Sequence, residues 1–118
     1  MEPIKLYDSE LKLMELLWRE GAISAKQISV LAQKEIGWNK NTTYTVIKKL
    51  IDKALVRRED PGFLCRALIS RDAVQKGETE RLIDKLWGGS KKAFFAAFID
   101  EHLSPDEINE LKNLIEKK

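Results

Sequence analysis

The stretch "WNKNTTYTVIKKLIDKALV", residues 38–56, joins a cluster of short polar side chains to a regular apolar pattern. On a helix with about 100° per residue, one side carries Thr43, Val46, Ile47, Leu50 and Ala54. The opposite side carries Asn41, Thr45, Lys48, Lys49 and Asp52, flanked by Thr42 and Tyr44. The segment therefore predicts a helix that starts after Asn39 as its N-cap, packs one face and offers polar groups on the other.

The polar face of this helix suits the major groove of DNA. Amides and hydroxyls can bond base edges, lysines can neutralise phosphates, and the first helical turn offers free backbone N–H groups. The same side chains could instead only start and solvate a helix. The candidate DNA-binding residues of this helix are Lys40, Asn41, Thr42, Tyr44, Thr45, Lys48 and Lys49.

Two further helices are predicted before residue 38. The first is "DSELKLMELLWRE", with Asp8 as N-cap and Gly21 as its end, and its apolar face carries Leu11, Met14, Leu17 and Trp18. The second opens with a capping box of Ser24 and Gln27 and ends at Gly37. We expect it to bury Ile28, Leu31 and Ala32. Two short helices joined by a tight turn to a third form a helix-turn-helix arrangement.

After this arrangement the hydrophobic period changes. "LVRRED-PG-FLCRALI" consists of two short extended runs around Pro61 and Gly62, which favour a tight reversal. Three helices followed by a basic hairpin predict a winged helix, in which Ile23 could supply a third short strand. The candidate DNA-binding residues of the wing are Arg57, Arg58 and Arg66.

The charge distribution agrees with a polyanionic partner. The whole chain has a formal net charge of +2, whereas residues 38–66 hold seven basic and three acidic residues, a difference of +4. Such a local patch is what nucleic acid requires, although an ordinary solvated surface can also carry it.

The remaining residues, 70–118, are predicted to be helical again. An amphipathic run ends at Gly88-Gly89, a second run carries phenylalanines, and a third opens with Ser104, Pro105 and Glu107. This segment is too short to bury its large apolar side chains by itself. A second copy of the chain would complete the core. We therefore expect a winged-helix DNA-binding domain over residues 1–69 and a helical dimerisation domain over residues 70–118. The candidate dimerisation residues are Trp87, Phe94, Phe98, Leu103, Ile108, Leu111, Leu114 and Ile115.

Little in the sequence favours catalysis or a cofactor. The lone cysteine, Cys65, lies in an apolar run and excludes a multi-cysteine metal site, and His102 is the lone histidine. Paired carboxylates occur only at adjacent positions, which do not face each other on a helix. We expect no catalytic residue, no metal and no cofactor. Without a long apolar run or a leader pattern, the chain is expected to be cytoplasmic and not to contact a membrane.

Several motifs together carry a resemblance to a known family. They are "DSELKLMELLW", "WNKNTTYTVIKKL", "LISRD", "LWGGS" and "LSPDEINELKNLIEKK". With them, the chain resembles the penicillinase repressor (BlaI/MecI/CopY) family of winged-helix transcriptional regulators from about residue 7 to its end. The resemblance implies a homodimeric repressor that binds a dyad-symmetric operator and pairs through its C-terminal helices. It also assigns recognition-helix motif positions to Thr42, Thr45 and Lys49.

The sequence departs from the family pattern at three places. Ala54 stands where the family usually has glycine, and Gly62-Phe63 and Cys65 replace the usual Gly-Arg and aromatic residue of the wing. Members that control antibiotic resistance are inactivated by cleavage of an Asn–Phe bond in the fifth helix. The matching bond here, Ala97–Phe98, is the candidate cleavage site, which would add a sensor or activating protease as a partner. The paired C-terminal cysteines of the copper-responsive branch are absent from this sequence.

Two functions from different classes fit the sequence. One is a dimeric transcriptional repressor that is derepressed by proteolysis in its C-terminal region. The alternative is a winged-helix module that binds another protein and does not bind DNA. Salt-sensitive binding to duplex DNA would separate the two.

Overall fold

The computed structural model describes residues 5–117. Contacts divide the chain into an N-terminal unit that ends at Glu78 and a C-terminal unit that begins at Thr79. This division falls within α4 (Arg71–Trp87), later than the expected boundary between residues 69 and 70. The predicted fold class, mostly helical with a small β wing, is confirmed.

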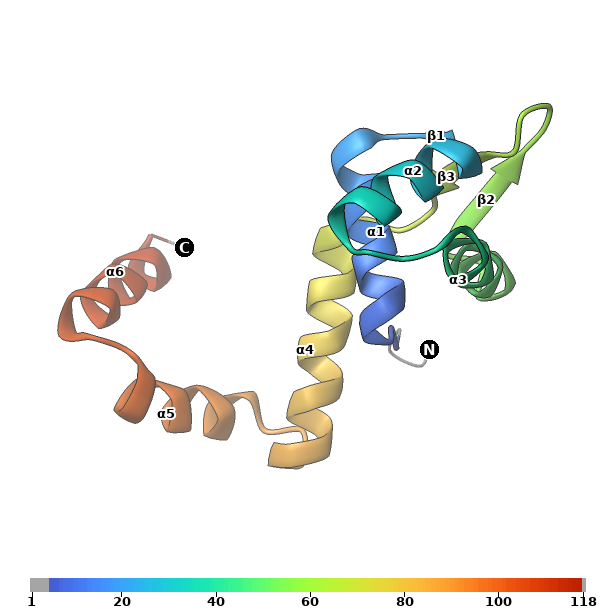
Figure 1. Cartoon of the computed structure of the whole chain (residues 1–118). Coiled ribbons are helices and arrows are strands. Elements are labelled where there is room, and N and C mark those ends of the chain that lie inside the picture. Colours follow the sequence, from blue (N-terminus) through green and yellow to red (C-terminus); the bar gives the residue numbers. More distant parts are fainter. Residues whose placement is uncertain (1–4, 118) are drawn as a thin grey trace. The chain divides into compact units, whose positions relative to one another are not determined.

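Besides the start of α4, the N-terminal unit contains three helices, namely α1 (Asp8–Glu20), α2 (Ala25–Glu35) and α3 (Lys40–Asp52) (Figure 1). The capping box of Ser24 and Gln27 and the Asn39 cap are present as predicted. The prediction of Asp8 as N-cap was wrong, because Tyr7 occupies that position. The Glu10 carboxylate accepts the backbone N–H of Tyr7 at 2.9 Å, so a residue inside the helix satisfies the cap.

A small antiparallel sheet completes this unit. Its strands are β1 (Ile23–Ser24), β2 (Val56–Glu59) and β3 (Leu64–Ala67), in the order β1-β3-β2. The predicted hairpin is confirmed, and Ile23 supplies the third strand by pairing with Cys65. The loop between β2 and β3, residues 60–63, projects from the helices in Figure 1 and contains a cis Asp60–Pro61 bond.

The core of the N-terminal unit draws on all three helices and the sheet. Its fully buried large side chains include Leu13, Met14, Leu17, Ile28, Ile47, Leu50 and Val56. Leu11, which the periodicity placed on the apolar face of α1, is instead 38 % exposed, and Leu16 is buried in its place. The buried face of α1 is therefore rotated from the predicted one, because Leu13 and Leu16 belong to the core and Leu11 does not.

The end of α3 shows the conformation that a glycine usually adopts. Ala54 has φ 61°, in the left-handed region. The N–H of Leu55 bonds the carbonyl of Leu50 at 3.0 Å, and the N–H of Ala54 bonds that of Ile51 at 2.9 Å. This pair of backbone hydrogen bonds is a Schellman motif. An alanine adopts its left-handed conformation at a cost of about 1 kcal/mol relative to glycine.

The C-terminal unit contains the end of α4 together with α5 (Lys91–His102) and α6 (Pro105–Glu116). Ser90 caps α5, and Ser104 forms a capping box with Glu107 at the start of α6. Neither α5 nor α6 contains a buried residue. Over residues 5–117, no helix combines the length and the apolar character needed to cross a membrane.

Candidate nucleic-acid interface

The predicted division of α3 into two faces is present in the structure. Thr43, Val46, Ile47 and Leu50 are buried. The side chains of Lys40, Asn41, Thr42, Thr45, Lys48 and Lys49 are all exposed. Tyr44 is half-buried, because its ring lies edge-on against Phe63 with 5.8 Å between the ring centroids. The helix therefore presents a continuous polar surface over a packed stripe.

Hydrogen bonds inside the helix decide which polar groups remain available. The Asn39 side-chain oxygen accepts the N–H of Thr42 at 2.8 Å, and the Thr45 hydroxyl donates to the carbonyl of Asn41 at 2.9 Å. Because its proton is used inside the helix, the exposed Thr45 hydroxyl is left able to accept a hydrogen bond from an outside donor. The side chain of Asn41 has no hydrogen-bond partner among the described residues, so its amide can both donate and accept.

The start of α3 borders an open hollow of about 370 Å³. Its lining residues are Ser9, Trp38, Asn39, Asn41, Thr42, Thr45, Val46 and Lys49. Ser9 and Trp38 were not predicted as members of this surface. Ser9 lies in the first turn of α1, far along the chain from the other lining residues. The position of Trp38, directly before the Asn39 cap, was a local signal that could have placed it there.

The lysines of α3 differ in what they contact. Lys48 and Lys49 form no ion pair within residues 5–117, and the ammonium of Lys40 lies 5.7 Å from the centre of the Tyr44 ring. Lys53, counted in the basic patch, instead bonds the Glu10 carboxylate at 2.7 Å. Glu10 is only 1 % exposed, so this pair joins the end of α3 to the start of α1 and adds no free charge to the surface.

The three wing arginines are all exposed, and each pairs with an acidic side chain. Glu59 accepts from Arg57 at 2.9 Å and from Arg66 at 3.0 Å, while Arg58 bonds Asp60 at 3.1 Å. The hydrogen bond from Arg66, and then that from Arg57, holds the pKa of Glu59 below its usual range. Glu59 and Asp60, both already included in the sequence count, thus lie next to the wing arginines and offset two of their three charges.

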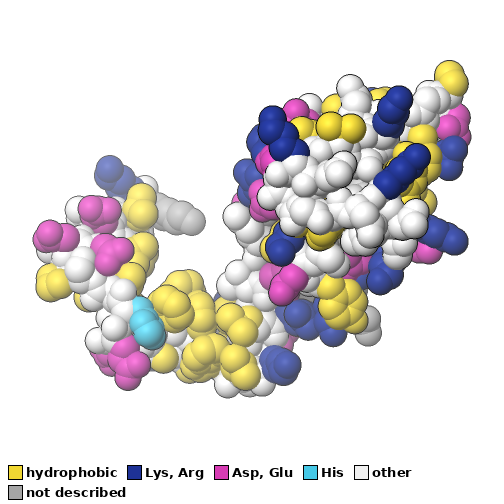
Figure 2. Space-filling view, viewed as in Figure 1, with side chains coloured by type: hydrophobic (Ala, Val, Ile, Leu, Met, Phe, Trp, Pro, Cys, Tyr) yellow, Lys and Arg dark blue, Asp and Glu magenta, His cyan; other side chains and the backbone are white. Residues whose placement is uncertain are grey.

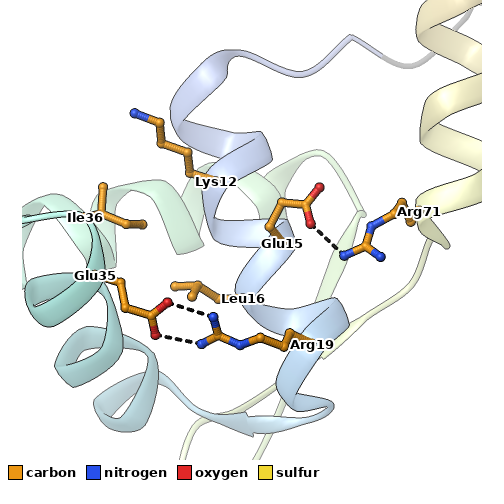
Figure 3. A pocket seen from close by; sticks show the side chains of 7 residues that line it. All are labelled: Lys12, Glu15, Leu16, Arg19, Glu35, Ile36 and Arg71. Atoms are coloured by element: carbon orange, nitrogen blue, oxygen red, sulfur yellow. Dashed lines mark hydrogen bonds and ion pairs between the residues drawn. The ribbon is translucent and has the colours of Figure 1, made fainter.

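A second hollow of about 500 Å³ lies between α1 and the end of α2 (Figure 3). Arg19 donates to both oxygens of Glu35 at 2.7 Å, and Arg71 pairs with Glu15 at 2.6 Å. The bond from Arg19 lowers the pKa of Glu35. Four of its five charged side chains form ion pairs, so we interpret this hollow as a place where ion pairs connect helices.

The candidate dimerisation residues are all at least partly accessible. Leu111, Leu114 and Ile115 are 39 %, 60 % and 73 % exposed, and Phe98 is 45 % exposed. Trp87, Phe94, Leu103 and Ile108 are of intermediate exposure. Hydrophobic side chains gather around α5 in Figure 2. Both residues of the candidate cleavage site, Ala97 and Phe98, are exposed on this helix.

A family model matches nearly the whole chain. The model described as penicillinase repressor matches residues 6–117. The methicillin resistance regulatory protein MecI of Mammaliicoccus sciuri is 26 % identical over 117 residues, which cover 97 % of this chain and 95 % of that protein. A penicillinase repressor of Staphylococcus aureus is 25 % identical over 115 residues, covering 95 % of this chain and 91 % of that protein.

Two solved structures resemble the N-terminal part of the fold. The solution structure of the DNA-binding domain of the repressor BlaI has a TM-score of 0.56 at 22 % identity and covers 62 % of this chain and 93 % of that one. The monomeric form of Bacillus licheniformis BlaI, in complex with the blaP half-operator, has a TM-score of 0.52 at 22 % identity. It covers 61 % of this chain and 90 % of that one. At such identity the likeness shows the shared fold.

Proposed function

Because the chain belongs to the penicillinase repressor family, we propose that it is a homodimeric transcriptional repressor that binds a dyad-symmetric operator through α3 and the wing. The relatives named above are a resistance regulator and a penicillinase repressor. The similar BlaI domain is bound to a half-operator in one of the two solved structures. These names support regulation of transcription over catalysis.

The observation that carries the proposal is the exposed polar face of α3. Asn41, Thr42 and Thr45 lie at the start of the helix, and Lys48 and Lys49 follow without ion pairs among the described residues. In this proposal the amide and hydroxyl groups bond base edges, and the lysines contact phosphates. In this proposal a phosphate also accepts from backbone N–H groups of the first turn, beside the Asn39 cap.

Dimerisation would supply the affinity that one winged helix lacks. Two α3 helices held in one molecule bind both halves of an operator, and the second contact is then intramolecular. We propose that α5 and α6 form this dimer, because none of their apolar side chains is fully buried within one chain. Removing those side chains from water would provide the driving force.

Derepression would follow from loss of the dimer. A cut at Ala97–Phe98 would separate α6 and the end of α5 from the rest of the chain. The winged helices would remain folded but would bind as single units, with the weaker affinity of a half-site. A sensor or activating protease would be the partner that makes this cut.

The test of DNA binding uses a duplex selected by the wild-type protein from a random pool. Thr45→Ala should weaken binding to this duplex by about 1–3 kcal/mol and barely change binding to a scrambled duplex. Lys48→Ala should weaken binding to both and reduce the salt dependence. If both variants keep the wild-type affinity at fixed salt, α3 is not the helix that recognises DNA.

The test of dimerisation uses sedimentation at micromolar concentration. Leu111→Asp places a charge in the proposed interface and should give monomers. Asn109→Asp adds the same charge at another exposed position of α6 and serves as the matched control. A Leu111→Asp variant that stays fully dimeric would rule out this interface.

The cleavage route is tested by following the protein in cells under inducing conditions by intact mass. The proposal expects a fragment that ends at Ala97. A full-length protein that leaves its operator under the same conditions would exclude cleavage and leave the dimeric repressor standing.

A further inference from the structure

The loop of the wing is tied to two helices through Phe63. Phe63 has φ 48°, in the left-handed region that a bulky residue seldom adopts. Its carbonyl accepts the backbone N–H of Ala25, the first residue of α2, at 2.9 Å. Its ring meets that of Tyr44 in α3 edge-on. The unusual backbone is thus held by contacts on both sides, as is expected where local strain serves a purpose.

Arg58 lies on the same aromatic ring. The central carbon of its guanidinium is 3.7 Å from the centre of the Phe63 ring. Its Nε donates to both carboxylate oxygens of Asp60, at 3.2 and 3.1 Å. The contact with the ring and the Nε bonds to Asp60 together restrain the guanidinium of Arg58.

The strand pattern separates Arg58 from the other two wing arginines. Successive side chains of a strand point to opposite faces. Arg58 is opposite Cys65 and two residues after Val56, both of which are buried, so it belongs to the face that packs on the helices. Arg57 is opposite Arg66 on the other face, and Glu59 bonds them both.

The two terminal nitrogens of Arg58 have no hydrogen-bond partner within residues 5–117. The side chain is 48 % exposed, so these nitrogens are open to a ligand. A guanidinium that is already restrained loses little entropy on binding, and its fork matches the oxygens of a phosphate. A phosphate of the DNA backbone beside α3 is the anion that this position would meet.

We propose that Arg58 is the phosphate-contacting residue of the wing and that Phe63 and Asp60 are positioning residues that hold its guanidinium. The inference rests on the proposed function, and it names which wing arginine binds the backbone and why. Phe63 thereby connects the wing to α3, because the ring that orients Arg58 also contacts Tyr44.

The test is a titration of the full chain with two duplexes at several salt concentrations. One duplex is selected by the wild-type protein from a random pool, and the other is a scrambled version of it. Arg58→Ala should reduce the slope of log affinity against log salt by about 0.9 on both duplexes. Lys34→Ala, which removes an exposed charge from the last turn of α2, should leave that slope unchanged.

Positioning is tested at Phe63 with a double-mutant cycle. Phe63→Leu should weaken binding by about two- to five-fold at fixed salt, whereas Phe63→Tyr should retain affinity because it keeps the aromatic face. In the Arg58→Ala background, Phe63→Leu should have no further effect on affinity. If Phe63 has only a structural role, Phe63→Leu should weaken DNA binding by the same factor with and without Arg58→Ala. That result would overturn the positioning proposal.

The remaining outcomes separate this inference from the proposed function. A wild-type chain that shows no salt-dependent binding to either duplex would overturn both. Salt-dependent binding whose slope survives Arg58→Ala would overturn only the role of Arg58. An Arg58→Ala loss confined to the selected duplex would indicate base reading and would overturn the phosphate assignment.

Discussion

The two units of this chain treat similar apolar side chains in opposite ways. In the N-terminal unit, Ile47 of α3 is 0 % exposed and belongs to a core shared by three helices and the sheet. In the C-terminal unit, Ile115 of α6 is 73 % exposed, and neither α5 nor α6 buries a residue. One unit therefore completes its core within a single chain, whereas the other keeps exposed apolar surface, which we propose a second copy covers.

The largest effect is expected when the side chains of Ile47 and Ile115 are truncated in parallel, which tests the contrast between the two units. Ile47→Ala should lower the free energy of unfolding of the N-terminal unit by about 2–5 kcal/mol, because it removes buried methyl groups and leaves a cavity. Ile115→Ala should leave that transition in place and weaken only self-association. Urea unfolding and sedimentation of both variants provide the measurements, and equal losses of unfolding free energy would contradict the contrast.

The next largest effect concerns the ion pair that connects α1 and α3. Lys53→Ala would leave the Glu10 carboxylate, 1 % exposed, without its cation. The expected loss of unfolding free energy is about 1–3 kcal/mol, since an unsatisfied buried group keeps its desolvation penalty. Lys48→Ala is the matched control, exposed and without an ion pair among the described residues, and should change stability by less than about 0.5 kcal/mol. If both variants unfold alike, the pair contributes no stability.

A smaller effect, of opposite sign, should appear at the end of α3. Ala54→Gly should raise the free energy of unfolding by about 1 kcal/mol, because glycine adopts φ 61° without steric cost. Ala54→Val should lower it, since a branched side chain fits the left-handed region less well. Thermal unfolding of the two variants checks the direction, and a destabilised glycine variant would contradict the conformation of Ala54.

The smallest effect is confined to alkaline solution. Burial raises the pKa of the Cys65 thiol from 9.0 to about 11. The unfolded thiol therefore loses its proton first, so its contribution to stability is complete below pH 9 and is lost as the pH rises towards 11. At pH 9, where half of the unfolded thiols have lost their proton, the loss should be under about 1 kcal/mol. It should be absent from Cys65→Ala, whose other titrating groups are the same. Parallel losses in both proteins would show that Cys65 is not the cause.

The parts of the fold that could be predicted from the sequence are those set by neighbouring residues. The Ser24–Gln27 capping box, the Asn39 cap and the hairpin around Pro61-Gly62 are local signals, and the structure contains all three features. The left-handed conformation of Ala54 was not predicted, although the resemblance placed a glycine of the family at this position. The buried stripe of α3 also followed from its 3.6-residue period.

Contacts between distant residues could not be predicted in the same way. Glu10 and Lys53 are 43 positions apart, and neither residue's local pattern indicates a partner. The Arg58–Phe63–Tyr44 contacts depend on where the hairpin lies against α3, which no periodicity describes. Leu11 was misplaced because α1 shows two overlapping apolar stripes, and only packing against other elements selects between them.

The central claim is that the N-terminal unit reads DNA while the C-terminal unit holds two copies together. The most direct measurement compares wild type and Leu111→Asp on a selected operator and on its isolated half-site. We expect Leu111→Asp to keep the half-site affinity of the wild type. On the full operator it should lose the gain of about 10²–10⁴-fold that two linked sites provide. A monomeric Leu111→Asp protein that keeps the full-operator affinity, or one that loses half-site binding, would contradict this division of roles.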